Sequence, residues 1–112
     1  MKDFFVYILT NKSNEVLYIG VTNNLLRRVI EHKQKAIKGF SYKYNTDKLI
    51  YYEQFERSDF VIEREKTLKK WNRVWKNEHG NKINSEWKDL FYEIGGNDEL
   101  LQKRLGFPLS RE

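Results

Sequence analysis

The sequence has no cysteine, a single proline and only two histidines. Without cysteine the chain can form neither a disulfide nor a cysteine-based zinc site, and a reducing compartment is the natural setting for such a protein. His32 and His79 do not show the spacing of zinc ligands, and the sequence has no phosphate-cradling glycine loop. No serine stands in a nucleophile-elbow context. These absences argue against zinc sites, P-loop chemistry and nucleophilic serine or cysteine catalysis.

Long hydrophobic segments are missing as well. The longest apolar run, residues 4–9, is far shorter than the roughly 20 residues that cross a bilayer. Strand-like residues follow residues 1–3 directly, so we expect no signal peptide. We therefore expect a soluble, cytoplasmic protein without a membrane partner.

Aromatic residues and positive charge are plentiful. Of 112 residues, 39% are hydrophobic and 15% aromatic, which is enough apolar surface for one compact domain. The formal net charge is +5, and residues 1–45 hold eight Lys and Arg against three acidic residues. Seven basic residues also gather between Val61 and Lys82. This distribution suits either a polyanion such as nucleic acid or a solvated helix face.

The hydrophobic pattern predicts the order of the elements. Two β-prone runs, residues 4–9 and 16–21, flank a polar turn and predict an antiparallel hairpin. The other expected elements are a helix from Asn23 or Asn24 to about Lys35, a loop over 38–47, a strand over 49–55, a helix from Ser58 to about Asn72 or beyond, a break at 77–81 and a short helix over 86–94.

This order predicts an α/β (α+β) domain, in which a small three-stranded, mostly antiparallel sheet is flanked by helices. We expect the domain to comprise residues 1–94 and residues 95–112 to form a loosely ordered C-terminal tail.

The hairpin is expected to bring two tyrosines to one face of the sheet. If the turn centres on Lys12 and Ser13, Tyr7 stands opposite Tyr18, and opposite residues share a face. Gly20 at a strand end fits a close approach of the backbone or a bulge. Paired tyrosines are also common in ordinary half-buried packing, so both a structural and a functional interpretation remain open.

Arg28 and His32 lie four residues apart in the first expected helix, at one rim of its apolar stripe. Arg27 falls outside that stripe and should face solvent. The Arg-His pair is either an ordinary surface pair or part of a phosphate site. In the second case Arg28 could bind two phosphoryl oxygens, and His32 could donate a hydrogen bond or transfer a proton.

Glu65 falls on the apolar stripe of the next expected helix, between Val61 and Leu68, whereas Glu63 should be solvated. A carboxylate on an apolar face needs a cationic partner. The partner is either a basic residue, Lys69 or Arg28, or a divalent metal. Mg²⁺ and Mn²⁺ prefer oxygen donors and often use only one or two carboxylates with water and phosphate.

Together these residues resemble the successive landmarks of the GIY-YIG nuclease superfamily. The specific signal is a Tyr-Ile-Gly tripeptide followed, ten residues after its tyrosine, by Arg, then by His and by an inward Glu on a later helix. The similarity covers residues 2–90, and the positions that carry it are residues 5–7 and 18–20, Arg28, His32, Glu65 and Asn84.

The segments 39–44, 49–53 and 64–71 look most like the small stand-alone bacterial branch that is related to the excinuclease nuclease domain. Two positions depart from the family pattern. Residues 5–7 read Phe-Val-Tyr, which keeps the functional Tyr7, and Ser85 stands after Asn84 where the family has proline.

The resemblance implies an endonuclease that uses Mg²⁺ or Mn²⁺ to hydrolyse phosphodiester bonds in DNA, including structured or damaged DNA in repair or recombination. It implies that Glu65 holds one metal ion and that Asn84 belongs to the catalytic set. The other implied roles are Tyr7 as general base, Tyr18 positioning water or phosphate, Arg28 stabilising the transition state, His32 assisting Tyr7, and Lys43, Lys69 and Lys70 contacting backbone phosphates.

Two other functions remain open at this point. The chain could be a non-catalytic nucleic-acid-binding module that kept the fold, or an interaction scaffold that uses Trp71, Trp75 and Trp87. The domain is small, so a partner protein could supply specificity, and a monomer is the default expectation. The choice between DNA and RNA also remains open.

Overall fold

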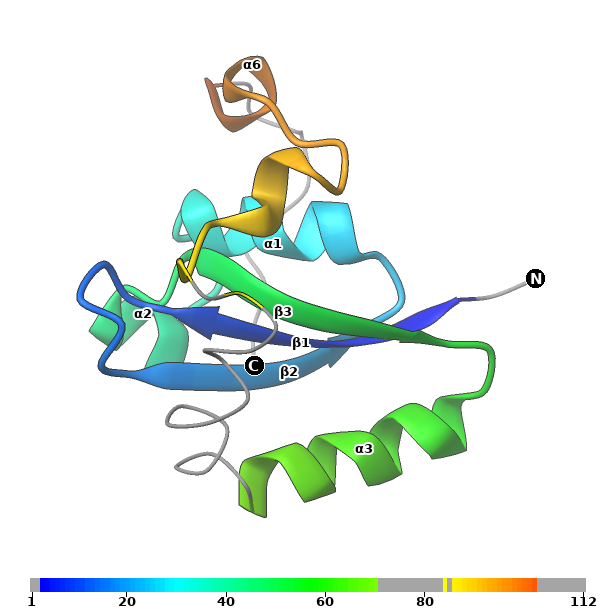
Figure 1. The fold of residues 1–112 in the computed structure, drawn as a ribbon. Coiled ribbons are helices and arrows are strands. Elements are labelled where there is room, and N and C mark those ends of the chain that lie inside the picture. The colour runs from blue at the N-terminus through cyan, green and yellow to red at the C-terminus, as the bar shows by residue number, and fades with distance from the viewer. Residues whose placement is uncertain (1–2, 71–83, 85, 103–112) are drawn as a thin grey trace.

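The computed structural model of the chain describes residues 3–70, 84 and 86–102. Three strands form one antiparallel sheet in the order β2-β1-β3, so the predicted sheet with flanking helices is confirmed. The elements follow one another as β1 (Phe4–Thr10), β2 (Leu17–Thr22), α1 (Leu25–Lys33), α2 (Phe40–Tyr44), β3 (Lys48–Phe55), α3 (Ser58–Lys70), the 3₁₀ helix η2 (Leu90–Tyr92) and α6 (Asp98–Gln102) (Figure 1).

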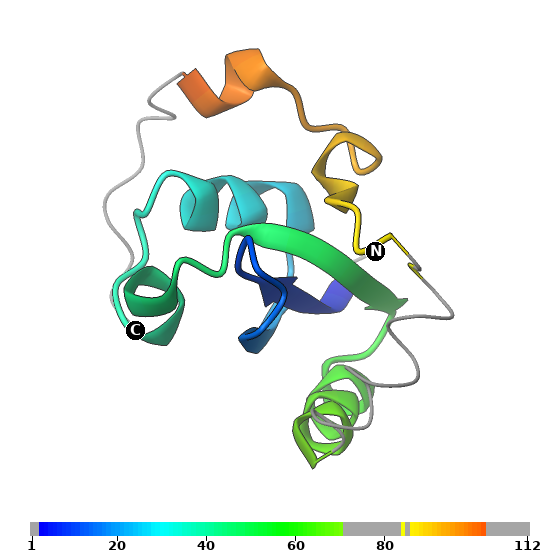
Figure 2. The ribbon, with the colours of Figure 1, turned by 60° about the vertical axis from the view of Figure 1, so that its left-hand side comes forward.

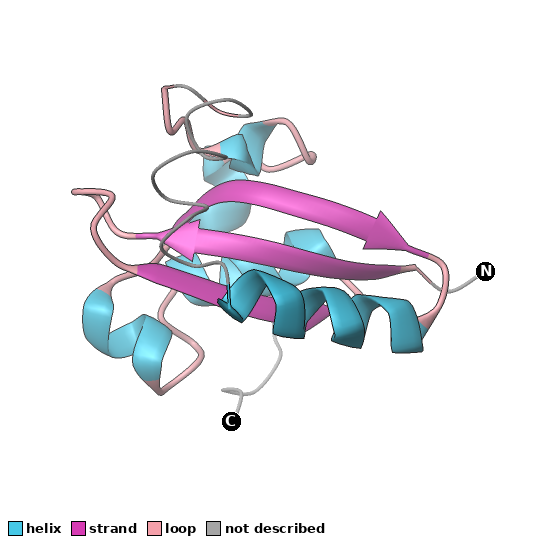
Figure 3. Ribbon diagram, turned by 60° about the horizontal axis from the view of Figure 1, so that its bottom comes forward, coloured by secondary structure: helices cyan, strands magenta, loops and turns pink. Residues whose placement is uncertain are grey.

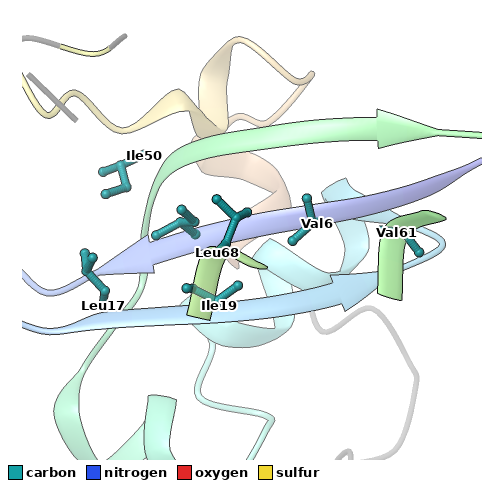
Figure 4. Packing of buried hydrophobic residues seen from close by; sticks show 7 residues of the cluster. Val6, Leu17, Ile19, Ile50, Val61 and Leu68 are labelled. Atoms are coloured by element: carbon teal, nitrogen blue, oxygen red, sulfur yellow. The ribbon is translucent and has the colours of Figure 1, made fainter. Parts of the chain in front are cut away.

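The sheet separates two hydrophobic clusters, with α1 and α3 on opposite sides of it (Figure 2). Side chains alternate along β1, so Val6 and Ile8 face α3 while Tyr7 and Leu9 face α1. The α3 cluster comprises Val6, Ile8, Leu17, Ile19, Ile50, Val61 and Leu68 (Figure 4). The α1 cluster comprises Tyr7, Leu9, Leu25, Val29, Ile30, Leu49 and Phe91.

Helix α3 runs alongside the strands (Figure 3). It begins at Ser58, as the sequence predicts, and its buried residues are Val61 and Leu68. The predicted end of this helix near Asn72 and the break at 77–81 lie outside the described residues. Within the described part of the chain, no helix is both long enough and apolar enough to cross a membrane.

The predicted register of the hairpin is wrong by two residues. Tyr7 pairs with Gly20 and Leu9 with Tyr18, because the turn centres one residue later than expected. The Asn11 side chain causes this shift: its Oδ1 accepts hydrogen bonds from the backbone N–H groups of Glu15, at 2.9 Å, and Val16, at 3.2 Å. A shift of two residues preserves the face of every side chain. Both phenols therefore still lie on the α1 side.

The prediction of a loop over residues 38–47 is wrong for residues 40–44, which form α2. Gly39 precedes this helix with a φ of 121°, and Asn45 ends it in the left-handed region with a φ of 55°. By contrast, α1 is capped by Asn24, one of the two predicted caps, whose side chain accepts a hydrogen bond from the Arg27 N–H group.

The predicted helix over residues 86–94 is also wrong, since only η2 forms there. Asp89 bridges this segment to the sheet: its Oδ1 accepts from the N–H groups of Leu49 in β3 and Phe91, and its Oδ2 lies 2.5 Å from Lys33 Nζ. The segment therefore covers the outer edge of β3 instead of forming a regular helix. Helix α6 lies within the predicted tail, and the division at residue 94 stays a prediction.

Candidate active site

Two tyrosines and a histidine from three different elements meet on the α1 side of the sheet. Tyr7 comes from β1, Tyr18 from β2 and His32 from α1. The Tyr7 hydroxyl lies 3.0 Å from His32 Nε2. The ring centroids are 6.2 Å apart for the two tyrosines and 5.3 Å apart for Tyr18 and His32. The sequence prediction that the two phenols share a face is thus confirmed by their contact.

Gly20 makes room for this cluster. A Cβ atom built on Gly20 would lie 2.5 Å from Tyr7 Oη and 3.0 Å from Tyr18 Cε2, both closer than ordinary van der Waals contact. The space that a side chain would fill at Gly20 is therefore taken by the Tyr7 hydroxyl. This packing explains why a Tyr-Ile-Gly sequence suits β2, since the glycine lies directly opposite Tyr7.

The proton positions on His32 follow from its second hydrogen bond. Ser41 Oγ lies 2.9 Å from His32 Nδ1, donates to the Thr46 carbonyl at 3.0 Å and accepts from Thr46 Oγ1 at 2.7 Å. Because the one hydroxyl proton of Ser41 is directed to that carbonyl, we infer that Nδ1–H donates to Ser41 Oγ. His32 Nε2 is then the acceptor, and the Tyr7 hydroxyl donates to it.

Burial, with a smaller contribution from the positive charge of Arg28, lowers the pKa of His32 from 6.5 to about 4. His32 is therefore neutral at neutral pH, as the acceptor role at Nε2 requires. The sequence placed His32 at the rim of the α1 apolar stripe, but the residue is buried. Its burial follows from α2, an element that was not predicted, because Ser41 of α2 bonds directly to its ring.

Arg28 is accompanied by a carboxylate that the sequence prediction missed. Glu31 is buried, and its carboxylate lies 3.6 Å from Arg28 Nε and 3.8 Å from Arg27 Nε. Arg27 is half exposed, which confirms that it faces solvent. The spacing of three and four residues on a helix is the signal that could have indicated these pairs. The two arginines and Glu31 line a polar hollow of about 470 Å³ together with Thr22, Asn23 and Asn24.

Glu65 lies on α3, on the other side of the sheet from the tyrosine cluster. Its side chain is 24% exposed and lies 3.4 Å from Lys69 Nζ, so the local ion pair with Lys69 is present. Helix α3 approaches the tyrosine cluster around the outer edge of β2. There Lys69 lines a hollow of about 290 Å³ with Leu17, Tyr18, Ile19 and Phe40.

The carboxylate of Glu65 fits one mode of metal binding. Among the described residues, no group of three or more His, Asp and Glu side chains could hold an ion. A partly exposed single carboxylate can still bind Mg²⁺ or Mn²⁺ if water and substrate phosphate complete the ligand shell. The residues present therefore fit a metal that is shared with the substrate, and they do not form a cage made by the protein alone.

Asn84 lies at the opposite edge of the sheet from Tyr18. Its side-chain amide donates to the carbonyls of Lys88, at 2.7 Å, and Ile50, at 3.3 Å, while its oxygen accepts from the Lys88 N–H group at 2.9 Å. These bonds anchor the following segment to β3, the strand farthest from β2. The structure does not bring Asn84 to the tyrosine cluster, and a catalytic role for it stays a prediction.

The three predicted phosphate-binding lysines are exposed. Lys43 lies on α2, while Lys69 and Lys70 end the described part of α3. Lys69 shares a hollow with Tyr18, so α3 contributes positive charge next to the cluster.

A sequence model of the GIY-YIG catalytic domain matches residues 3–84 of the chain. The chain belongs to the GIY-YIG family. No curated protein and no solved structure matched it in the same comparisons. GIY-YIG domains are nucleases, act on nucleic acid and generally depend on divalent metal ions. The predicted superfamily is thereby confirmed, while the relation to the excinuclease branch stays a prediction.

Proposed function

We propose that this GIY-YIG domain is an active endonuclease that hydrolyses phosphodiester bonds in DNA with the help of Mg²⁺ or Mn²⁺. The observation that carries the proposal is the hydrogen bond between Tyr7 and neutral His32, placed beside Tyr18 and Arg28. The proposal includes a cytoplasmic location and structured or damaged DNA as the substrate, and these two parts rest on the sequence alone.

Tyr7 and His32 can share the proton of the attacking water. A free tyrosine has a pKa near 10, so a tyrosinate is scarce at neutral pH. If the water proton moves to the Tyr7 oxygen while the Tyr7 proton moves to His32 Nε2, no free tyrosinate forms. Tyr7 is 1% exposed, so this step requires the attacking water to be bound inside the site, in contact with the Tyr7 hydroxyl. The hydroxide then attacks phosphorus, and the bond to the leaving oxygen breaks. The leaving oxygen takes a proton from water, and the hydroxide so formed takes the proton of His32 back through Tyr7, which restores the site.

His32 begins this step as a weak base because burial and Arg28 lower its pKa to about 4. The approach of a phosphate anion opposes both effects, since a nearby negative charge favours the protonated ring. We therefore infer that proton transfer to His32 occurs when substrate is bound, which limits the reaction to the complex.

Arg28 and Tyr18 are the groups of the cluster that can touch the substrate. The Arg28 side chain is partly exposed, and its guanidinium can donate to two phosphoryl oxygens and offset the charge of the transition state. Glu31 lies beside Arg28 Nε and holds the guanidinium in place. Tyr18, which is also partly exposed, can position the phosphate or the attacking water.

Glu65 is the residue that would hold the metal ion, which when bound neutralises charge on the phosphoryl group and on the leaving oxygen. Lys69 is largely exposed, so its ion pair with Glu65 is worth little and can be exchanged for a metal. Lys69 released in this way remains close enough to Tyr18 to bind a neighbouring phosphate.

The test is cleavage of plain, branched and damaged DNA by the purified protein with Mg²⁺ or Mn²⁺. We expect Glu65→Gln to lower the rate by roughly 10²–10³-fold, as for removal of one transition-state contact. Glu63→Gln is the matched control, because Glu63 is exposed on the same helix and should leave the rate unchanged. Failure of the wild-type protein to cut any of these substrates with either metal would contradict the proposal.

A second candidate is a nucleic-acid-binding module without catalysis. The ion pair between Glu65 and Lys69 favours it, because the carboxylate already has a cationic partner. This candidate predicts salt-dependent binding that Glu65→Gln leaves unchanged or strengthens, with no cleavage at any metal concentration.

A further inference from the structure

Helix α2 exposes a group of aromatic rings next to the candidate site. Phe40 is 48% exposed and Tyr44 41% exposed, and their ring centroids are 4.6 Å apart. The Phe40 ring also lies stacked beside Tyr18, with centroids 6.3 Å apart and an angle of 24° between the planes. Phe40 and Tyr44, here called the α2 platform, thus extend the aromatic surface of the site outward into solvent.

The platform is held firmly relative to the catalytic cluster. Ser41, the residue after Phe40, is buried and bonds both to His32 Nδ1 and to Thr46. Any displacement of α2 would therefore break the hydrogen bonds that orient His32. Exposed aromatic rings fixed in this way lose little conformational freedom on binding a ligand.

Positive charge surrounds the platform. Lys43 Nζ lies 5.4 Å from the centroid of the Tyr44 ring, and Lys35 Nζ lies 5.2 Å from that of exposed Tyr42. Lys69 shares the hollow beside Phe40, and α2 itself carries no acidic residue. Lysine is depleted in the buried centres of protein–protein interfaces. Aromatic faces bordered by lysines match a nucleobase and its flanking phosphates instead.

We propose that the α2 platform stacks an unpaired base of the nucleic-acid substrate next to the scissile phosphate. This inference rests on the proposed function, since the base belongs to the strand that the site would cut. Within a duplex both faces of a base are covered by its neighbours, so only an unpaired or flipped base can stack on Phe40. The domain should therefore select single-stranded, branched or distorted sites over regular duplex.

The test is binding without divalent metal, measured by fluorescence anisotropy on two single strands of equal length. One strand carries bases throughout, and the other has a central run of abasic nucleotides. We expect the wild-type protein to bind the complete strand more tightly. Phe40→Ala should weaken that binding roughly 5- to 100-fold, as for the loss of one base–aromatic stack, and should leave the abasic strand unaffected.

Phe60→Ala is the matched control, because Phe60 is an exposed phenylalanine (55%) on α3 that contacts Arg57. Phe60→Ala should bind both strands as the wild type does. Phe40→Leu keeps apolar volume without an aromatic ring and should behave like Phe40→Ala. Equal affinity of the wild type for the two strands, or unchanged binding by Phe40→Ala and Tyr44→Ala, would overturn the inference. A dimer in sedimentation that Phe40→Ala dissociates would also overturn it, because a second copy would then cover the platform.

The outcomes for this inference and for the proposed function can be told apart. Metal-dependent cleavage without base preference in binding overturns the α2 platform and leaves the nuclease. Base preference that Phe40→Ala removes, combined with absent cleavage, supports the platform and contradicts the nuclease. Absence of binding to either strand overturns the platform, and the cleavage assay then decides separately on the nuclease.

Discussion

The two faces of the sheet are built from the same strands but differ in chemistry. On the α3 side, Val6 and Ile8 of β1 pack against Val61 and Leu68 in a cluster whose buried members are all aliphatic. On the α1 side, their neighbour Tyr7 belongs to a hydrogen-bonded series that continues through His32, Ser41 and Thr46. One face therefore serves mainly to stabilise the fold, and the other holds polar groups in a fixed arrangement.

This comparison separates stability from chemistry. Aliphatic packing is non-directional, so its residues tolerate exchange for others of similar volume. A buried series of hydrogen bonds depends on direction, and removal of one member leaves another without a partner. Adjacent residues of β1 should thus respond to substitution in opposite ways.

Ile8→Ala should produce the largest loss of stability. Ile8 is fully buried on the α3 side, and truncation of such a residue costs about 2–5 kcal/mol. We expect urea denaturation to show this loss, while the cleavage rate per folded molecule stays near that of the wild type. If the cleavage rate per folded molecule also fell strongly, stability and catalysis would not be divided between the two faces of the sheet.

His32 should make stability depend on pH. The unfolded chain binds a proton at this histidine near pH 6.5 and the folded chain near pH 4, so the unfolded state holds more protons in between. Stability should therefore fall as the pH drops from 6.5 to 4, by about 3 kcal/mol from this residue. Denaturation of the wild type and of His32→Gln across this range measures the effect as a difference. If the free energy of unfolding depends on pH in the same way in both proteins, the inferred burial of a neutral His32 ring is contradicted.

Gly20→Ala should have a smaller effect on stability, about 1–3 kcal/mol, as for other overpacking substitutions. The added Cβ would lie 2.5 Å from Tyr7 Oη and should displace the hydroxyl from His32. Val21→Ala is the control, because Val21 lies one residue along on the other face. The NMR signals of the His32 ring should shift in Gly20→Ala and stay unchanged in Val21→Ala. Unchanged His32 signals in Gly20→Ala would show that Gly20 does not determine the position of Tyr7.

Local patterns in the sequence were sufficient to predict the sheet, the positions of α1 and of the start of α3, and the shared face of the two tyrosines. The hairpin expected from the two β-prone runs placed Tyr7 and Tyr18 on one face, and Asn23 or Asn24 marked the start of α1. The hairpin register could not be predicted from the pattern, because it depends on hydrogen bonds of the Asn11 side chain. A shift of two residues nevertheless left the shared face of the tyrosines intact.

Features that arise from tertiary packing could not be predicted in this way. Helix α2 has five residues, too few for a periodic pattern, yet it buries His32 through Ser41. Asp89 interacts with β3 and with Lys33, which are distant in sequence, and its bonds replace a predicted helix by η2. The catalytic roles of Tyr7, Arg28 and Glu65 depend on a substrate complex, and they stay predictions.

The most direct test of the Tyr7–His32 relay is single-turnover cleavage of DNA with Mg²⁺ by Tyr7→Phe and Tyr52→Phe. Tyr52 is the partner of Tyr7 in β3, packs on the same face and bears the same hydroxyl group on the strand farthest from β2. We predict that Tyr7→Phe slows cleavage at least about 100-fold while Tyr52→Phe cuts at nearly the wild-type rate. Equal rates for the two variants would contradict a catalytic role for the Tyr7 hydroxyl.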